Sequence, residues 1–109
     1  MFAFRWHMTP QTVNAYYSLQ SNEVVFPAGI LQPPFFHKDL PLSINYGAIG
    51  TVIGHEMTHG FDNQGREFDA DGNMRFWWTE LASANFENKS KCFIEQYSKF
   101  LMDGEKTLG

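Results

Sequence analysis

The pattern of hydrophobic and polar residues predicts two short strands near the start of the chain. Residues 13–17 are rich in β-branched and aromatic side chains, and residues 23–26 have the same character before Pro27 ends the run. The polar stretch between them, residues 18–22, is typical of a turn. We therefore expect the two strands to pair as a hairpin whose first strand is an exposed edge.

A helix is predicted from about residue 43 to residue 60. Residues 45–54 combine small and β-branched apolar side chains, as expected of a helix packed closely inside a larger body. Gly60 can end this helix. Residues 28–36, by contrast, contain two consecutive prolines that remove backbone donors and fix φ, so we expect a packed apolar loop there and no regular element.

A second helix is predicted from about residue 79 to residue 102. Thr79 is a suitable N-cap, and an apolar stripe recurs at helical spacing along the segment: Phe86, Phe93, Tyr97, Phe100 and Leu101. We expect this stripe to be core and the helix to stop at Asp103-Gly104. With strands and loops in residues 9–41 and a turn-rich segment at residues 61–78, the chain is predicted to be α+β and mainly helical.

Length and composition indicate part of a larger body. The chain has 109 residues, of which 43% are hydrophobic and 17% aromatic, and this is more apolar aromatic surface than a small domain easily covers. The net charge of −4 offers no basic surface, which excludes nucleic acid as a partner. No run approaches the roughly 18 apolar residues of a membrane span, and residues 1–6 do not have the order of a signal peptide.

The candidate chemistry lies in the stretch from His55 to His59. Positions four apart lie one above the other on a helix, so these two histidines can hold one metal ion while Glu56 flanks it without ligating it. Zinc held by three protein ligands lowers the pKa of a bound water to about 7, and a nearby carboxylate can take the proton. The pattern predicts metal-assisted amide hydrolysis; the alternative is two solvated surface histidines and a solvated carboxylate.

Asp62 and Asn14 are further candidates, each with a simpler alternative. Asp62 follows His59 by three residues and is placed to accept the second N–H of that imidazole, although it can equally be a turn residue. Asn14 lies on the edge strand, where its side chain can both donate to and accept from the backbone of an extended peptide. Its alternative role is a local contact in a turn.

Several other polar residues carry weaker signals. Four residues match positions of a calcium-binding loop, but Met74 occupies the position that requires glycine, so calcium is not expected: Asp69, Asp71, Asn73 and Glu80. Glu67 with Asp71 mimics a Glu-x-x-x-Asp helix motif, yet flanking glycines disfavour a helix there. His7 and His37 are each expected to be exposed rather than metal-bound.

Cys92 and Asn88 depend on the compartment of the protein. Cys92 is the only cysteine, so it is either a small buried apolar residue or half of a disulfide whose partner lies outside this chain. Asn88 begins an Asn-Lys-Ser glycosylation acceptor, which has meaning only in a secreted protein.

Taken together, these motifs resemble the neprilysin and endothelin-converting-enzyme family of zinc metallopeptidases, from about Trp6 to Gly109. Besides the zinc motif and the following Gly60-Phe61-Asp62, the resemblance rests on residues 13–17, 26–36, 64–66, 77–78 and 96–97.

The resemblance implies part of a thermolysin-like (gluzincin) catalytic domain with one Zn²⁺ per complete domain. His55 and His59 would be zinc ligands, Glu56 the catalytic base, and Asp62 the residue that orients His59. Asn14 and Ala15 match the family's substrate-backbone strand. Peptides are therefore the expected partners.

The resemblance also implies an extracellular or cell-surface location, because family members are mostly single-span membrane proteins with the peptidase outside the cell. Cys92 matches a cysteine that is bridged to one far upstream. The membrane anchor is expected in an N-terminal part that this chain lacks, and the oligomeric state is not indicated.

One departure from the family pattern leaves two hypotheses. The third zinc ligand of the family lies in a Glu-x-x-x-Asp motif directly after Thr-Leu-Gly, and this sequence ends at Thr107-Leu108-Gly109. We therefore expect the third ligand, and the downstream His and Arg that stabilise the oxyanion and hold substrate, outside these residues. The chain is then a segment of a zinc endopeptidase; the alternative is a catalytically inactive, weakly metal-binding fragment of one.

Overall fold

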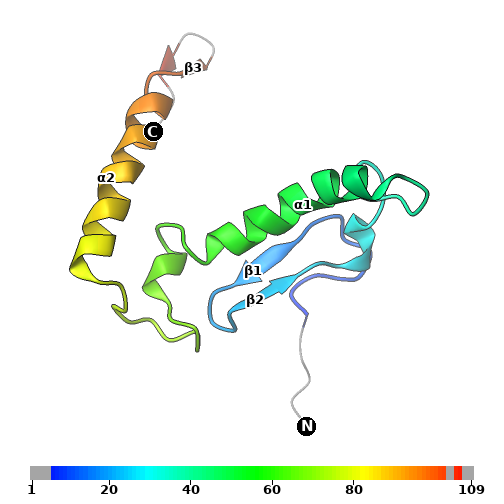
Figure 1. Ribbon diagram of the computed structural model, residues 1–109, viewed down its shortest axis with the longest axis horizontal. Coiled ribbons are helices and arrows are strands. Elements are labelled where there is room, and N and C mark those ends of the chain that lie inside the picture. Colours follow the sequence, from blue (N-terminus) through cyan, green and yellow to red (C-terminus); the bar gives the residue numbers. More distant parts are fainter. Residues whose placement is uncertain (1–5, 103–104, 107–109) are drawn as a thin grey trace. The chain divides into compact units, whose positions relative to one another are not determined.

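The computed structural model describes residues 6–102 and 105–106, and the chain divides into two compact units, Met1–Phe76 and Trp77–Gly109. Two α-helices of 18 residues, two 3-10 turns and two short two-stranded sheets make up the regular structure of the described residues. This confirms the predicted α+β, mainly helical class (Figure 1). No helix in the described part of the chain combines the length and apolarity that crossing a bilayer requires.

The first unit begins with the predicted hairpin. Strand β1 (Tyr16–Ser18) pairs antiparallel with β2 (Glu23–Val25), and Tyr17 lies opposite Val24. The turn ends at Asn22, whose φ of 51° is left-handed, a conformation that asparagine tolerates better than most residues. The strand is shorter than predicted, because residues 13–15 precede the paired part of β1.

The loop that follows contains one regular turn that the sequence did not predict. Residues Ala28–Ile30 form a single 3-10 turn before the two prolines, and Ile30 is only 3% exposed. The backbone of Gly29 passes so close to residue 11 that an added Cβ would lie 2.5 Å from the Gln11 carbonyl oxygen. The expectation of no regular element is therefore wrong for residues 28–30, and the loop is packed only as far as Ile30, because Leu31 is 51% exposed.

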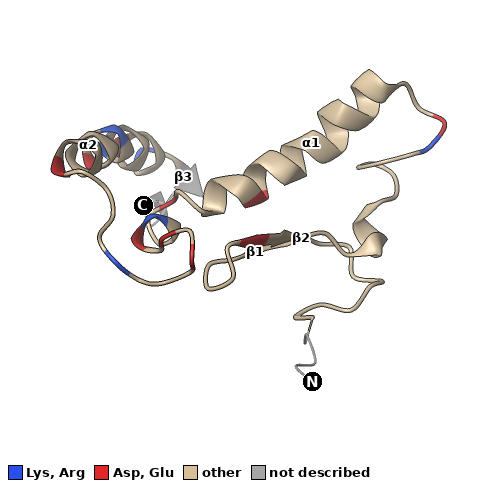
Figure 2. Cartoon of the chain, turned by 60° about the horizontal axis from the view of Figure 1, so that its bottom comes forward, with Lys and Arg blue, Asp and Glu red and all other residues tan. Residues whose placement is uncertain are grey.

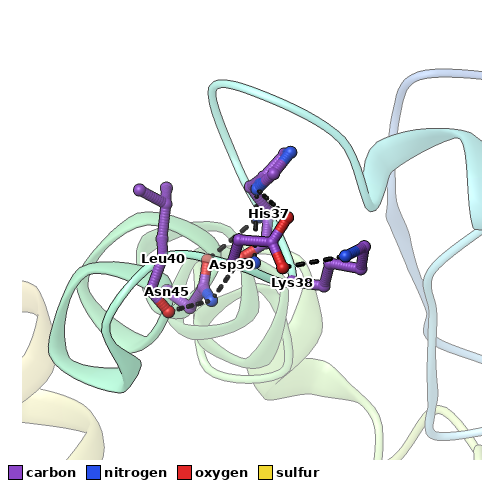
Figure 3. A network of polar contacts seen from close by, with 5 residues as sticks. All are labelled: His37, Lys38, Asp39, Leu40 and Asn45. Carbon is purple, nitrogen blue, oxygen red and sulfur yellow. Dashed lines mark hydrogen bonds and ion pairs between the residues drawn. The ribbon is translucent and has the colours of Figure 1, made fainter.

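The start of α1 (Leu42–His59) is held by the side chain of Asn45 (Figure 3). Its Oδ1 accepts from the His37 N–H at 3.0 Å, and its Nδ2 donates to the His37 carbonyl oxygen at 2.8 Å. Asn45 is 7% exposed, so these bonds satisfy a buried amide. They matter because Pro41, which precedes the helix, provides no side-chain cap.

His37 is partly exposed beside Asp39, as the sequence predicted for a histidine outside the metal site. The Lys38 ammonium and the Asp39 carboxylate form an ion pair at 2.8 Å in the same loop. Ten residues of helix separate Asn45 from His55, a rise of about 15 Å. This loop and the zinc motif therefore lie at opposite ends of α1.

Helix α1 packs against the hairpin, as Figure 1 shows, and ends within one residue of the predicted position. Gly60 follows the helix in a right-handed conformation, with φ of −65°, instead of the left-handed cap that a terminal glycine often adopts. The Gly60 N–H bonds to the Met57 carbonyl, and the Phe61 N–H to the Thr58 carbonyl at 2.9 Å. These shorter-range bonds tighten the last turn.

The buried apolar core is small in the part of the chain that the structure describes. Ala15 and Ile30 are its only buried hydrophobic residues, whereas Leu42 and Tyr46 on α1 are more than 70% exposed. An apolar helix face of this extent is typical of a segment that other structure covers.

In the second unit, α2 runs over Glu80–Tyr97. The predicted N-cap is confirmed, because the Thr79 hydroxyl oxygen accepts from the Ala82 N–H at 3.1 Å. The predicted end near residue 102 is wrong: the helix closes at Tyr97, and Leu101–Met102 (β3) pairs with Glu105–Lys106 (β4). The predicted stop, Asp103-Gly104, lies outside the described residues.

The apolar stripe of α2 is not core in this structure, which corrects the prediction. No residue of α2 is buried, and Phe93 and Tyr97 are each at least 60% exposed. Phe86 has an edge-on contact with Trp78, with ring centroids 5.7 Å apart. Helical periodicity identifies an apolar face correctly, but whether that face is covered depends on structure beyond the helix.

Candidate metal centre

A pocket of about 350 Å³ lies between the hairpin and the C-terminal end of α1. The hairpin side of the pocket is formed by residues 14–17 and Leu19. The other side is formed by His55, Glu56 and His59 with Asp62 and Gln64 from the turn after the helix. The candidate metal ligands, the candidate base and the candidate substrate strand, predicted separately from the sequence, thus line one pocket.

His55 and His59 lie one helical turn apart and direct the same ring nitrogen toward a common point. Their Nε2 atoms are 3.1 Å apart, and the rings meet edge to face with centroids 4.7 Å apart. Two nitrogens of a tetrahedral zinc site, each about 2.0–2.1 Å from the metal, would be about 3.3 Å apart. The pair therefore fits two positions of a zinc site.

Asp62 fixes which nitrogen of His59 is available. Its Oδ2 lies 2.8 Å from His59 Nδ1, so Nδ1 is the protonated nitrogen and donates to the carboxylate, which leaves the lone pair on Nε2. The other carboxylate oxygen, Oδ1, accepts from the backbone N–H groups of Gln64 at 2.9 Å and Gly65 at 2.8 Å.

These bonds also keep Asp62 ionised. Partial burial by itself would raise the pKa of its carboxyl group, but the hydrogen bonds from the Gly65 N–H, His59 and the Gln64 N–H outweigh that effect. The pKa of Asp62 is consequently below its ordinary value. At neutral pH the group is therefore an anion that can orient an imidazole.

The turn after the helix can be this tight only because residue 65 is glycine. A Cβ on Gly65 would lie 1.8 Å from the His59 carbonyl oxygen and 2.8 Å from the Gly60 carbonyl carbon. Both are backbone atoms, which have no freedom to rotate away. The absence of a side chain at position 65 thus allows the N–H of that residue to reach Asp62.

Glu56 is buried at the pocket, with an exposed fraction of 6%. It is the only Asp, Glu, Lys or Arg residue of α1, and Figure 2 shows it as the single red band on that helix. A carboxylate placed in an otherwise uncharged helix and facing a pocket costs desolvation free energy, so its position favours a chemical role over a structural one.

No third metal ligand joins the two histidines within the described residues. No group of three or more His, Cys, Asp or Glu side chains there is placed to hold a metal ion. Glu67 lies in a 3-10 turn, Gly65–Glu67, and no helix carries it and Asp71 together. The expectation that this pair only mimics a ligand motif is in keeping with that arrangement.

Asp69, the first residue of the apparent calcium loop, has a structural role. Its Oδ1 accepts from the backbone N–H groups of Asp71 and Asn73, and its Oδ2 pairs with Arg75 Nε at 2.5 Å. Asp69 is 8% exposed, and its carboxylate accepts hydrogen bonds from the backbone of the turn. A buried, already paired carboxylate of this kind explains the aspartate without a metal.

Asn14 and Ala15 form the part of the pocket wall that precedes β1. Ala15 is buried, at 6% exposed, and its N–H donates to Asn14 Oδ1 at 2.9 Å. Asn14 thereby makes the local contact that was the simpler alternative for it. It is exposed and also lines the pocket, so the local contact and a role toward a peptide are compatible.

Four pocket residues were not singled out as site residues by sequence reasoning: Tyr16, Tyr17, Leu19 and Gln64. Tyr17 lay within the predicted strand, and alternation from Ala15 would have placed both on one face. Gln64 entered the sequence analysis only as part of the motif at residues 64–66, because its place at the pocket depends on the turn that Asp62 closes.

Cys92 and Asn88 lie on α2 in the other unit. Both are exposed, so the alternative of Cys92 as a small buried residue is wrong within the described structure. The cysteine is unpaired among the described residues.

Comparison with known proteins identifies the family. The model of peptidase family M13 matches residues 14–107. Human endothelin-converting enzyme 1 is 52% identical over 105 residues, which span 96% of this chain and 14% of that enzyme. An endothelin-converting enzyme homolog of Locusta migratoria is 51% identical over 110 residues, with 96% and 15% covered.

Solved structures of related peptidases are also similar to this chain. The zinc metalloprotease Zmp1 of Mycobacterium tuberculosis, in complex with an inhibitor, matches with a TM-score of 0.87 and 51% identity over 94% of this chain and 16% of that one. PepO from Lactobacillus rhamnosis matches with a TM-score of 0.87 and 38% identity over the same shares. The family implies zinc, and the resemblance found in the sequence motifs is confirmed. The chain belongs to peptidase family M13, the neprilysin and endothelin-converting-enzyme family of zinc metallopeptidases.

Proposed function

We propose that this chain is the metal-helix segment of a zinc-dependent endopeptidase. The observation that carries the proposal is the convergence of the His55 and His59 Nε2 atoms, 3.1 Å apart, in a pocket that Glu56 also lines. The chain spans 14–16% of the length of these relatives: human endothelin-converting enzyme 1, its Locusta migratoria homolog and Zmp1. The activity therefore belongs to a longer protein that contains these residues.

His55 and His59 would hold the zinc ion through Nε2. The third ligand is proposed to be the glutamate of the Glu-x-x-x-Asp motif that the family resemblance implies, outside the described residues. When bound, zinc lowers the pKa of a water molecule and polarises the carbonyl of the peptide bond. Glu56, which is 6% exposed and lines the same pocket, would take the proton from the attacking water.

The substrate class is proposed to be peptides bound in extended form along residues 14–15. These residues precede β1 on the pocket wall opposite the metal helix. An edge of this kind can bind a peptide through backbone groups, whatever its sequence. The Asn14 amide would add a donor for the peptide backbone.

The alternative is that the 109-residue chain by itself is catalytically inactive and binds metal weakly. Two observations favour it for the isolated chain: no third ligand lies near the histidines in the described residues, and Ala15 and Ile30 alone are buried apolar residues there. Both functions are compatible, since one concerns the longer protein and the other the segment.

The isolated chain is predicted to bind zinc with a free energy well below the roughly 10–16 kcal/mol of complete structural zinc sites. It should also bind a hydrophobic dye and unfold without a sharp transition, because its apolar faces are uncovered. Calorimetric zinc titration and urea unfolding followed by circular dichroism measure these properties. Tight stoichiometric zinc binding with chelator-sensitive peptide cleavage would exclude the alternative.

Replacing the base is predicted to separate metal binding from turnover. The experiment uses a chimera, full-length human endothelin-converting enzyme 1 in which this chain replaces the matching 105 residues. Glu56→Gln should retain zinc but lower kcat at least about 100-fold. Glu67→Gln, an exposed control, should leave both unchanged. Full activity of Glu56→Gln would refute the assignment of the base.

Asp62→Asn is predicted to weaken zinc binding in the chimera by about 10- to 100-fold. Asparagine keeps an oxygen for the Gln64 and Gly65 N–H groups but can place an NH₂ against His59 Nδ1–H, so the turn survives while the imidazole loses its acceptor. Competition with a chromophoric chelator measures the affinity. Asp71→Asn, on an exposed carboxylate, is the control, and equal affinities in the two variants would contradict the role.

The longer protein is further proposed to face the extracellular space, where Asn88 can be glycosylated and Cys92 can form a disulfide. Expression through a secretory pathway should add an N-glycan at exposed Asn88 and leave Cys92 in a disulfide with a cysteine outside this chain. Peptide mass mapping detects both. Asn85→Gln, which alters no acceptor, should keep the glycan that Asn88→Gln loses; an unmodified Asn88 with a free Cys92 thiol would argue against this location.

A further inference from the structure

The turn of the hairpin is hydrogen-bonded to a loop that lies 48 residues further along the chain. The Tyr17 hydroxyl donates to Asn22 Oδ1, and Asn22 Nδ2 donates in turn to the Ala70 carbonyl oxygen at 3.1 Å. One side chain, Asn22, therefore joins a residue of the pocket wall to the loop after the metal helix. None of these bonds is part of the hairpin's own backbone pairing.

The two backbones meet at the same place. Gly72 has a left-handed φ of 76°, and a Cβ there would lie 1.9 Å from the Gln20 carbonyl oxygen. The loop thus touches the hairpin turn closely enough to require glycine. Asn22 also has a left-handed φ, so both sides of this contact use conformations that most residues avoid.

Tyr17 also touches the end of the metal helix. A Cβ on Gly60, the residue directly after His59, would lie 3.0 Å from the Tyr17 hydroxyl oxygen and 3.1 Å from the ring carbon that bears it. The phenol therefore acts as a spacer between β1 and the end of α1. Its hydroxyl is held by Asn22, so the spacer has one orientation.

We propose that Tyr17 and Asn22 are positioning residues, which set the distance between the substrate strand at residues 14–15 and the metal ligands on α1. The inference rests on the proposed function, because it assumes that peptide binds along that strand. The two walls of the pocket belong to different elements. Tyr17 lies against the end of α1 at Gly60, and Asn22 joins Tyr17 to the loop at Ala70. A peptide bound along residues 14–15 must fit between the two walls, so a change in their separation weakens peptide binding.

Loss of the Tyr17–Asn22 and Asn22–Ala70 hydrogen bonds should affect peptide binding more than the metal site. His59 is oriented by Asp62, and neither Tyr17 nor Asn22 is hydrogen-bonded to either of those residues. Zinc affinity should therefore be unchanged. A loosened hairpin should bind the peptide backbone less well, which appears as a higher KM.

The test compares Asn22→Gly and Tyr17→Phe in the full-length chimera with a fluorogenic peptide. Glycine keeps the left-handed backbone of residue 22 but removes both side-chain bonds, and phenylalanine keeps the ring but removes the hydroxyl. Each variant should raise KM about three- to tenfold, as expected for lost hydrogen bonds. The value of kcat should change less than about twofold, and zinc content should not change.

Ser21→Ala is the matched control, because it removes the Ser18–Ser21 hydroxyl contact in the same turn without touching the loop at Ala70. Its KM should equal that of the unsubstituted chimera. The double variant Tyr17→Phe/Asn22→Gly should be no worse than the more affected single variant, since both changes break one connection. Multiplied effects would mean that the Tyr17 hydroxyl touches substrate itself, and would overturn the positioning role.

Three outcomes test this inference and separate it from the proposed function. If Glu56→Gln is inactive while Asn22→Gly and Tyr17→Phe have an unchanged KM, the function holds and the positioning role fails. If Ser21→Ala raises KM as much as Asn22→Gly, any disturbance of the turn has the same effect and the positioning role also fails. If Glu56→Gln is fully active, the proposed function itself is refuted.

Discussion

The carboxylate of Asp62 is the point on which the metal centre depends. One of its oxygens orients His59, and the other closes the turn that leads away from α1. The same carboxylate therefore stabilises the turn after α1 and orients a candidate metal ligand. Because both tasks use charge-assisted hydrogen bonds, the turn and the imidazole cannot rearrange separately.

Local chemistry explains why much of this structure could be predicted from the sequence. The hairpin, the span of α1 and the Thr79 cap all follow from residues that lie within a few positions of one another. The pairing of His55 with His59 likewise follows from helical spacing of four residues, and that of His59 with Asp62 from a turn only three residues long. Such features depend little on the rest of the fold.

The features that sequence reasoning missed are those that depend on distant structure. Whether the α2 stripe is covered, and where α2 stops, depend on what lies against Phe93 and Tyr97. The hydrogen bond from Asn22 to Ala70 joins residues 48 positions apart. The pattern of hydrophobic and polar residues in the two segments does not predict it. Asn45 is a similar case, since its amide satisfies a loop that precedes its helix.

The close approach of Gly65 to the His59 carbonyl defines what can be moved between proteins as a unit. A designer who grafts only the five residues from His55 to His59 onto a foreign helix would transfer two ligands and a base but no orienting carboxylate. An extra residue in the turn before Gly65 would also separate that carboxylate from its backbone donors. The smallest transferable module is therefore α1 together with its turn, residues 42–65, kept at its present length.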